Sequence, residues 1–451
     1  MLSIQPFRFL HTGDLHLDSP FQGIRSSAPD WVTRALRDAT VAAWASIVEM
    51  AVAEKVDFVV VAGDVFENAN RTLRGQVTFV DGLRTLAGAS IPSFVVAGNH
   101  DPLSGWEPTI AWPGLAHRFG TDGVTAIPVV RDGTEIARVY GISYPVRDVR
   151  ENLARRFRRE PEAPFAIGLL HANVGGQPGH ELYAPCSIAD LAASGMDYWA
   201  LGHVHRHGVL HAVGPTVVYC GNPQGRDPGE SGARGCYVVE VDAAGVVRPE
   251  FRASDVVRWA ALDVDIGGVA TEDALLSQLT RRLDDARTAA EGRSLVVRMT
   301  LVGRGPLHAN IGRPGFVDDL RALVQEAVGT GTPFTWIDSL ADATRPEVDL
   351  AAIRDQASGF LAEFLRETDA TRTALDAAPP VADEPDGAAP SSVPYGLEPT
   401  RIDEVLATLY EHPRLRRALR SAGESRPRGD RLAALIDRAE TLVVDRLADE
   451  G

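Results

Sequence analysis

Short apolar runs that alternate with amphipathic helical stretches constrain the fold of this 451-residue chain more than any other feature. The segments "FRFLHTGD" (7–14), "DFVVVAGD" (57–64) and "IPSFVVAGNHD" (91–101) are rich in β-branched and aromatic residues. Helical stretches near 30–54 and 71–88 lie between them. Because near-continuous apolar strands are typical of sheets buried on both faces, this alternation predicts an α/β fold layered around a buried sheet.

Later segments extend this pattern and then change it. The segments "FAIGLLH" (165–171) and "MDYWALGHVH" (196–205) have the composition of buried strands, and residues 210–252 predict further, more antiparallel strands. Strand and helix patterns alternate again over 255–345, where they predict a small separate α+β domain. These boundaries leave residues 1–254 as the first domain.

The C-terminal part of the chain predicts helices on either side of a linker. A helix is expected over 346–376, and residues 377–397 are rich in Pro, Ala, Asp and Ser, which is typical of a flexible linker. Residues 398–451 predict helices with two apolar stripes, formed by Ile402, Val405, Leu406, Leu409 and Tyr410, and by Leu432, Leu435, Ile436, Ala439, Leu442 and Val443. Such stripes fit either the groove of a partner protein or an ordinary helical hairpin packed on the chain's own body.

Composition narrows the compartment and the class of partner. A net charge of −16 argues against nonspecific coating of nucleic acid by the whole surface, although a local basic groove or a metal site can still offset phosphate charge. The three cysteines show no CxxC spacing, which favours a reducing cytoplasm over a disulfide framework. The N-terminal residues lack the pattern of a signal peptide, and no run reaches the roughly 18 apolar residues that a membrane span needs. We therefore expect a cytoplasmic protein that does not enter a membrane.

Five predicted strands end in polar residues of one chemical type. Because ligand sites in open α/β sheets gather beyond the carboxyl ends of the strands, these residues are expected to converge. A single Gly-Asp after a strand is usually a turn, and a single histidine there is usually a boundary residue, but five such endings in one chain favour a common site. The residues are Asp14, His16, Asp64, Asn99, His100, Asp101, His171, His203 and His205.

The chemistry of these side chains predicts a metal centre. Imidazole, carboxylate and amide oxygen suit manganese, iron or zinc, and suit calcium poorly. The set offers more donors than one ion needs, so two ions that share one carboxylate use it better. Two cations roughly 3.5–4 Å apart can clamp the attacking and leaving oxygens of a phosphoryl displacement and supply hydroxide near neutral pH. The sequence therefore predicts a two-metal phosphoester hydrolase.

The order of the motifs, D-x-H, G-D, G-N-H-D, H and G-H-x-H, resembles the calcineurin-like metallophosphoesterase superfamily over about residues 7–225. The strings "HTGDLHLDSPFQG" (11–23) and "YCGNPQGR" (219–226) are similar to bacterial DNA repair exonucleases of the SbcD type, especially their YhaO branch. The resemblance implies a β-sandwich flanked by helices. It further implies a small capping domain and C-terminal helices that dock on a partner ATPase.

The resemblance also implies roles for individual residues. The implied ligands are Asp14, His16 and His205 for one ion, Asn99, His171 and His203 for the other, and Asp64 as the bridge between them. His100 would protonate the leaving oxygen or stabilise the transition state, and Asp101 could orient His100 by a hydrogen bond. The usual metal of such proteins is manganese, with magnesium as a weaker substitute.

Arginines are the candidate contacts to a nucleic acid. Arg226, in the loop that resembles the YhaO branch, is a candidate DNA-binding residue. The segment 147–160 carries six arginines and could track a phosphate backbone. It also carries acidic residues, so we favour a solvated helix face there.

Three functions are compatible with these features. The leading one is a Mn-dependent DNA nuclease, at least an exonuclease, that acts on DNA ends in repair as a homodimer with an SMC-like ATPase resembling SbcC. The alternative is a phosphodiesterase or phosphatase for nucleotides or another small phosphoester, because a metal core alone does not determine the substrate. The third is a scaffold whose metal site mainly holds an ATPase in place. The 255–345 domain and the C-terminal helices favour the nuclease, because a minimal small-molecule phosphodiesterase needs neither.

Overall fold

The computed structural model describes residues 4–19, 21, 23–24, 28–67, 72–104, 110–176, 181–329, 331–347, 364–366, 368–370 and 373. Residues 1–344 form one compact unit, and residues 345–451 belong to a second. The predicted linker at 377–397, the predicted helices of 398–451 with their apolar stripes, and most of the predicted 346–376 helix lie outside the described residues. The fold below is that of the first unit.

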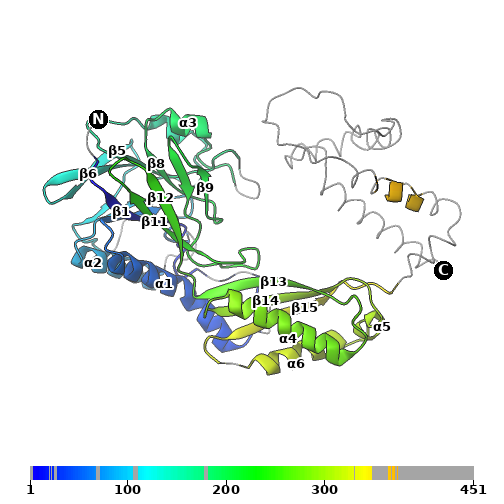
Figure 1. Cartoon of the computed structure of the whole chain (residues 1–451). Helices are drawn as coiled ribbons and strands as arrows, with labels where there is room; N and C mark the ends of the chain where they lie inside the picture. Colours follow the sequence, from blue (N-terminus) through cyan, green and yellow to red (C-terminus); the bar gives the residue numbers. More distant parts are fainter. Residues whose placement is uncertain are drawn as a thin grey trace. The chain divides into compact units, whose positions relative to one another are not determined.

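Two six-stranded sheets form the main body of this unit (Figure 1). The first sheet contains, in order, β12 (Val247–Ala253), β11 (Gly235–Val241), β1 (Phe7–Thr12), β2 (Phe58–Ala62), β3 (Ser93–Val96) and β4 (Ala116–Arg118). The second contains β5 (Thr125–Arg131), β6 (Thr134–Gly141), β7 (Ala166–His171), β8 (Tyr198–Gly202), β10 (Thr216–Tyr219) and β9 (Gly208–His211). Strands β1 to β4 are mutually parallel, and so are β7 and β8, whereas β11 and β12 are antiparallel to their neighbours.

The two sheets pack face to face around an apolar core. Phe9, Val60 and Phe94 of the first sheet lie in one buried cluster with Leu169 and Ala200 of the second. Such packing of two sheets through their inner faces is the arrangement of a β-sandwich. The predicted α/β class and the sandwich implied by the resemblance are therefore both confirmed.

Helices cover the outer faces of the sandwich. Helices α1 (Asp30–Ala53) and α2 (Leu73–Gly88) pack on the first sheet, and α3 (Ile188–Ala192) and the 3₁₀ turn at Leu153–Arg156 pack on the second. The central strands are thus buried on both faces, which explains their near-continuous apolar sequences. Among the helices in the described ranges, none is both long and apolar enough to cross a membrane.

A smaller layer follows β12, and we call residues 257–342 the three-stranded unit. Its parallel strands are β13 (Val257–Asp265), β14 (Ser294–Val302) and β15 (Thr335–Asp342). Helices α4 (Glu272–Ala289), α5 (His308–Ile311) and α6 (Phe316–Val328) cover one face of this sheet. Strands and helices alternate along this unit, which belongs to the same compact unit as the sandwich.

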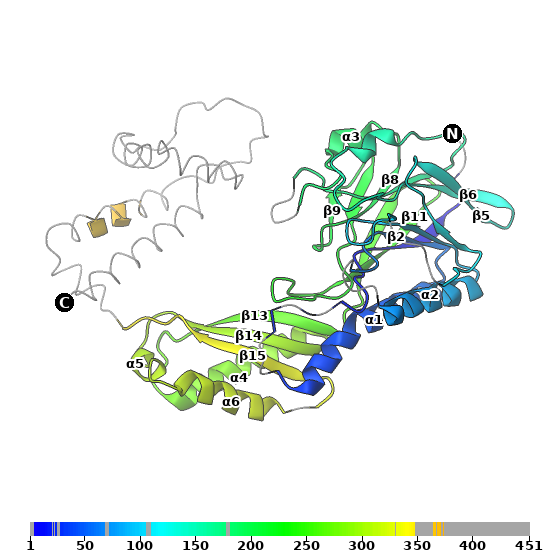
Figure 2. The same ribbon diagram turned by 180° about the vertical axis from the view of Figure 1, so that it is seen from behind.

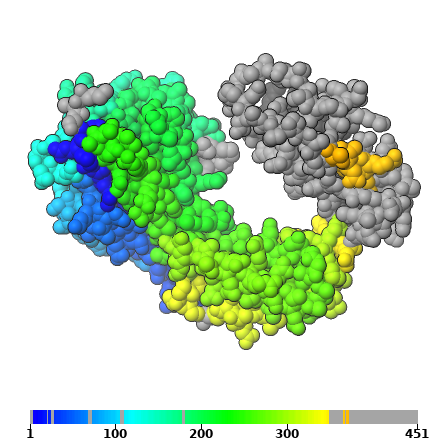
Figure 3. Space-filling model, viewed as in Figure 1, coloured from blue at the N-terminus to red at the C-terminus, as the bar shows by residue number. Residues whose placement is uncertain are grey.

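Helix α1 packs against both the sandwich and the three-stranded unit. Val32 and Leu36, near its N-terminus, lie in one buried cluster with Trp259 and Trp336 of the three-stranded unit. Figure 2 shows this end of α1 beside the strands of the three-stranded unit. Trp44, further along the same helix, packs on the first sheet of the sandwich. In the space-filling view the surface of the three-stranded unit runs without a break into that of the sandwich (Figure 3). One continuous helix therefore ties the two layers together.

Candidate metal centre

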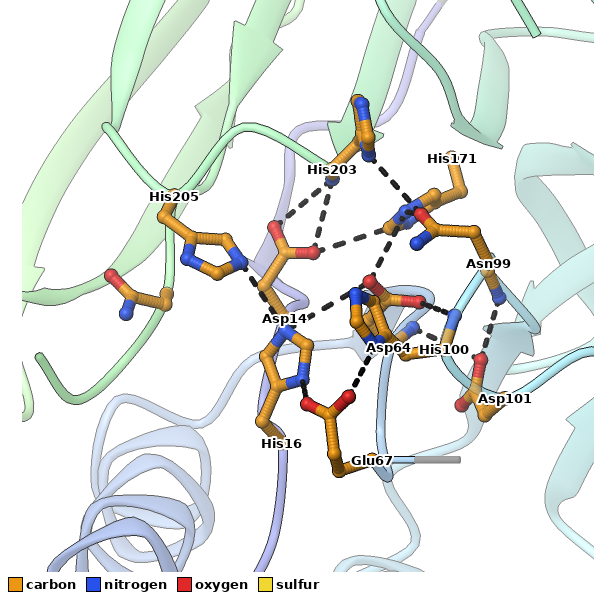
Figure 4. Close-up of polar contacts among 12 residues, drawn as sticks. Asp14, His16, Asp64, Glu67, Asn99, His100, Asp101, His171, His203 and His205 are labelled. Atoms are coloured by element: carbon orange, nitrogen blue, oxygen red, sulfur yellow. Dashed lines mark hydrogen bonds and ion pairs between the residues drawn. The ribbon is translucent and has the colours of Figure 1, made fainter. Parts of the chain in front are cut away.

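The carboxyl ends of β1, β2, β3, β7 and β8 meet in one place, and the polar side chains that follow them gather there (Figure 4). Parallel strands end at the same edge of a sheet, and the sandwich brings the edges of both sheets together. The gathered residues are Asp14, His16, Asp64, Asn99, His100, Asp101, His171, His203 and His205. The structure thus brings together every residue that the sequence singled out at the strand ends.

The first donor group consists of Asp14, His16 and His205, which follow β1 and β8. One ligand atom from each lies within 4.8 Å of the others. The Nε2 atoms of His16 and His205 are 3.2 Å apart, and Nε2 of His16 lies 3.8 Å from Oδ2 of Asp64. Ring nitrogens and a carboxylate that converge in this way match the donor set of a transition-metal cation.

The second donor group consists of Asn99, His171 and His203, from the ends of β3, β7 and β8. Oδ1 of Asn99 lies 2.9 Å from Nε2 of His171 and 3.2 Å from Nδ1 of His203. Oδ2 of Asp64 is 3.4 Å from the same nitrogen of His171. Asp64 therefore contacts both donor groups, which is the position that a bridging carboxylate needs.

Burial makes the two carboxylates of this centre depend on a nearby positive charge. Asp14 and Asp64 are each 1% exposed, and His171 is fully buried. Burial raises the pKa of Asp14 to about 6, and although burial by itself would lower the pKa of His171, the neighbouring Asp64 raises it to about 9. Because buried carboxylates need a compensating positive charge, a divalent cation fits this site.

The backbone is strained at four of the candidate donors. The φ angles of Asp14, His16, Asp64 and His203 are 49°, 43°, 52° and 96°. Positive φ is uncommon for residues other than glycine and costs about 1–3 kcal/mol at each position. The surrounding structure therefore holds the backbone of these donors in strained conformations at the ends of three strands.

Glu67 is a member of the site that the sequence analysis missed. Its carboxylate lies 2.5 Å from Nδ1 of His100, 3.1 Å from Nδ1 of His16 and 3.4 Å from Nη1 of Arg226. Burial would raise the pKa of Glu67, but its hydrogen bonds with His100 and His16 hold it below its usual range. For His100, burial by itself would lower the pKa, but the hydrogen bond with Glu67 and the negative charges of Asp64 and Glu67 together outweigh burial and raise the pKa. The only sequence signal was an acidic residue three positions after Asp64.

Glu230 is the second missed residue, and it lies in the loop between β10 and β11. One carboxylate oxygen is 2.5 Å from Nδ1 of His205. The other accepts hydrogen bonds from Nδ2 of Asn222 at 2.8 Å and from the backbone N–H of Arg226 at 2.7 Å. A carboxylate on Nδ1 directs Nε2 of a histidine toward a metal. No local pattern marked this residue, which lies 25 positions after its histidine.

The predicted hydrogen bond between Asp101 and His100 is wrong. The carboxylate of Asp101 instead accepts backbone N–H groups of Gly98 at 2.7 Å, Val65 at 2.7 Å and Asp64 at 3.2 Å. Asp101 is 2% exposed and points into the loops after β2 and β3, so it fastens these two loops to each other. Glu67 occupies the position beside His100 that we expected Asp101 to take.

Arg226 lies at the edge of the centre, with its side chain 13% exposed. Its Nη1 donates hydrogen bonds to Oγ of Ser19 at 3.0 Å and to Glu67. Its buried Nε has no hydrogen-bond partner among the described residues. This guanidinium therefore lies beside the first donor group, which it reaches through Glu67 and His16.

The arginine-rich segment 147–160 lies in ion pairs. Arg155 pairs with Asp190 at 2.8 Å, Arg156 with Glu151 at 2.5 Å, and Arg159 with Asp197 at 2.7 Å. We expected a solvated helix face here, but within this segment only Leu153–Arg156 is helical, as a short 3₁₀ turn, and the acidic partners neutralise these three arginines.

Substitution of Gly98 tests how tightly the centre is packed. A Cβ atom at this position would lie 2.3 Å from Oδ1 of Asp64 and 2.8 Å from Cε1 of His171. We expect Gly98→Ala to displace these donors and weaken Mn²⁺ binding at least about tenfold in calorimetric titration. Gly120→Ala is the control, because a Cβ atom there would meet no atom within 4 Å. Wild-type affinity in Gly98→Ala would contradict the proposed ligand set.

Comparisons with known proteins match two parts of the chain. A calcineurin-like phosphoesterase family model matches residues 7–207, and the model for the middle domain of the metallophosphoesterase YhaO matches residues 259–345. The first match contains all five strand ends of the centre. The second covers most of the three-stranded unit.

Individual relatives agree with these family matches. The chain is 37% identical over 364 residues to an uncharacterized metallophosphoesterase YhaO of Bacillus subtilis, and the match covers 80% of this chain and 87% of that protein. It is 29% identical to a DNA double-strand break repair protein Mre11 of Haloferax volcanii, over 58% of this chain and 55% of the relative. It is 24% identical to one component of the nuclease SbcCD of Bacillus subtilis, over 50% of this chain and 63% of that component.

Proposed function

Because the chain belongs to the calcineurin-like metallophosphoesterases, and among them to the YhaO family, we propose that it is a Mn-dependent DNA nuclease that hydrolyses phosphodiester bonds at DNA ends in repair. The observation that carries the proposal is the position of Asp64 between two groups of donors, which suits two ions that share one carboxylate. The names of two relatives, a DNA double-strand break repair protein and a nuclease component, support DNA as the substrate.

The donor groups divide the proposed metal ligands between two ions. Asp14, His16 and His205 hold one ion, Asn99, His171 and His203 hold the other, and Asp64 bridges them. A pair of Mn²⁺ ions bound there would lower the pKa of a water molecule and offset the charge of the phosphoryl group. Glu67 and Glu230 keep the rings of His16 and His205 turned inward.

His100 is the proposed proton donor to the leaving oxygen. Its side chain is 27% exposed, so it reaches the accessible side of the centre. Glu67 engages its Nδ1, which leaves Nε2 as the nitrogen that faces a substrate. Arg226 is the proposed DNA contact, because its guanidinium lies beside Glu67 and donates at the same edge. Asp101 supports the reaction by holding the loops of Asp64 and Asn99.

A comparison of substrates tests the proposal against the alternative of a small-phosphoester hydrolase. Purified full-length protein with Mn²⁺ is incubated with linear DNA, with bis(p-nitrophenyl) phosphate and with nucleotides. We expect DNA to be degraded, and the His100→Ala variant to degrade it about 10²–10⁴-fold more slowly. Rapid turnover of nucleotides with intact DNA would instead establish the small-phosphoester activity.

The proposed partner is an SMC-like ATPase resembling SbcC, which a cytoplasmic homodimer of this chain would bind. The relative named as one component of the nuclease SbcCD supports such an assembly. Light scattering of the purified chain measures its oligomeric state, and we expect a dimer. Deletion of residues 395–451 is expected to abolish co-purification with a co-expressed ATPase of this class and to leave Mn²⁺ binding unchanged.

A further inference from the structure

The three-stranded unit contacts two of the loops that form the candidate centre. The first is the β1 loop (described residues 13–19, 21, 23 and 24), which carries Asp14 and His16. The second is the β10 loop (residues 220–234), which carries Arg226 and Glu230. These contacts involve buried side chains. They support the donors of one of the two proposed ions, the one held by Asp14, His16 and His205.

Gln224 joins the β10 loop to Val257, the first residue of β13, and to Val256 just before it. Its side chain is 1% exposed, and its Oε1 accepts the backbone N–H groups of Val256 at 2.9 Å and Val257 at 3.2 Å. Its Nε2 donates to the carbonyl of Val257 at 2.5 Å. The same loop then presents Glu230, whose carboxylate lies 2.5 Å from Nδ1 of His205. The start of β13 is therefore connected to His205 through one short loop.

Trp259 of β13 contacts both loops at once. Its indole N–H donates to the carbonyl of Gly225, in the β10 loop, at 3.2 Å. Its ring also stacks on Phe21 of the β1 loop, with the centroids 6.5 Å apart and the planes 23° from parallel. Trp259 is 2% exposed, so neither contact is open to solvent. One aromatic side chain of the three-stranded unit thus supports the loop of Asp14 and His16 and the loop that holds His205.

Arg298 of β14 adds a second contact to the β1 loop. Its guanidinium donates to the carbonyl of Gly23, and its Nε pairs with the fully buried carboxylate of Asp338 at 2.8 Å. Because Asp338 lies on β15, this contact connects the β1 loop to two strands of the three-stranded unit.

The second donor group is held by the sandwich itself. Nδ1 of His171 pairs with the carbonyl of Ala62, at the end of β2, at 2.9 Å. Nε2 of His203 pairs with the carbonyl of Glu181 at 2.8 Å. These two histidines are therefore oriented by backbone carbonyls of the sandwich, whereas His205 is oriented by Glu230 of the β10 loop.

We infer that the three-stranded unit positions one half of the two-metal centre, so that the affinity for the ion held by Asp14, His16 and His205 depends on Gln224 and Trp259. The affinity for the ion held by Asn99, His171 and His203 does not depend on these two residues. Groups that orient metal ligands change metal affinity when they are removed, and preorganised ligands depend on such support. The inference rests on the proposed two-metal centre, and its test measures ion binding separately from hydrolysis.

Mn²⁺ titration of the full-length chain tests this inference in the variants Gln224→Ala and Trp259→Phe. The second variant keeps an aromatic ring and removes only the indole donor and part of the stacking surface. We expect the wild type to bind two ions, and each variant to bind one ion about 10–100-fold more weakly, with the other within about twofold. Electron paramagnetic resonance should show the coupled pair of Mn²⁺ ions in the wild type, and mainly isolated ions in the variants at the same concentration.

Gln325→Ala is the matched control for Gln224→Ala. Gln325 makes the same kind of bridge inside the three-stranded unit, since its Nε2 donates to the carbonyl of Thr335 at 3.1 Å and its Oε1 accepts the N–H of Ile337 at 2.8 Å. Its loss should lower the stability of the unit and leave both ions bound as in the wild type. A selective loss of one ion in this control would overturn the inference, because general loosening would then explain it.

The remaining outcomes separate the inference from the proposed function. Suppose that the wild type binds two ions. Unchanged binding in both variants, or equal weakening of both ions, would then overturn the inference but not the proposed function. A wild type that binds fewer than two ions would overturn the proposed two-metal function and the inference with it. If Gln224→Ala does not fold, the conservative Trp259→Phe variant decides.

Discussion

Asp64→Asn is expected to abolish phosphoester hydrolysis, with a loss of at least about a thousandfold in rate. Asp64 accepts the backbone N–H of His100 through Oδ1 at 2.9 Å, while its Oδ2 faces His171 and His16 at 3.4 and 3.8 Å. Asparagine has the same shape and can keep the bond to His100. It removes the negative charge and replaces Oδ2, the oxygen that faces both donor groups, with an amide nitrogen, so it should prevent two ions from binding together.

Thermal unfolding with and without Mn²⁺ measures this effect independently of hydrolysis. A ligand that binds only the folded state stabilises it by about 2.7 kcal/mol at a concentration one hundred times its Kd. We expect Mn²⁺ to raise the Tm of the wild type and to raise that of Asp64→Asn much less. Asp242→Asn is the control, because this carboxylate lies in the turn between β11 and β12 and accepts the N–H groups of Ala244 and Val246. Retention of two-ion binding in Asp64→Asn would refute the bridging role.

The strand ends of the site were predictable because the relevant information is local. A short β-branched run predicts a buried strand, and the residues that follow it are adjacent in sequence, as in "FVVVA" followed by Gly63 and Asp64. The division of strands between two sheets was not predictable from these patterns. Strands β1 and β2 are parallel neighbours in one sheet, and β7 and β8 are parallel neighbours in the other. Because both pairs have the same apolar composition, composition does not indicate which sheet a strand joins.

The residues that support the donors were harder to predict because their contacts connect distant segments. Arg226 lies 159 positions from Glu67, and nothing in either local sequence indicates that they meet. The error at Asp101 has the opposite cause. We expected it to bond His100 because the two residues are adjacent in sequence. In the tight turn after β3 the two adjacent side chains diverge, and the backbone N–H groups of Gly98, Asp64 and Val65 offer Asp101 better hydrogen bonds than His100 does.

Glu67→Gln is expected to slow DNA hydrolysis about 10²–10⁴-fold, the range typical of general acid catalysis. The Glu67 carboxylate faces three nitrogen atoms, those of His100, His16 and Arg226. Glutamine offers a single acceptor oxygen and places an N–H₂ donor against the remaining groups. His100 should therefore lose its orientation, while Mn²⁺ binding should weaken less than in Asp64→Asn. Glu54→Gln is the control, because Glu54 pairs with Arg8 on the surface at 3.0 Å.

The choice of leaving group separates proton donation by His100 from stabilisation of charge on the phosphoryl group. The p-nitrophenolate ion leaves without a proton, whereas the leaving oxygen of DNA needs one. If Glu67 acts by orienting His100 as a proton donor, Glu67→Gln and His100→Ala should both slow DNA hydrolysis far more than hydrolysis of bis(p-nitrophenyl) phosphate. The double variant should then be no slower on DNA than the slower single variant, because both changes remove one function. Equal losses on both substrates, together with additive effects in the double variant, would instead assign the two residues separate roles in stabilising the transition state.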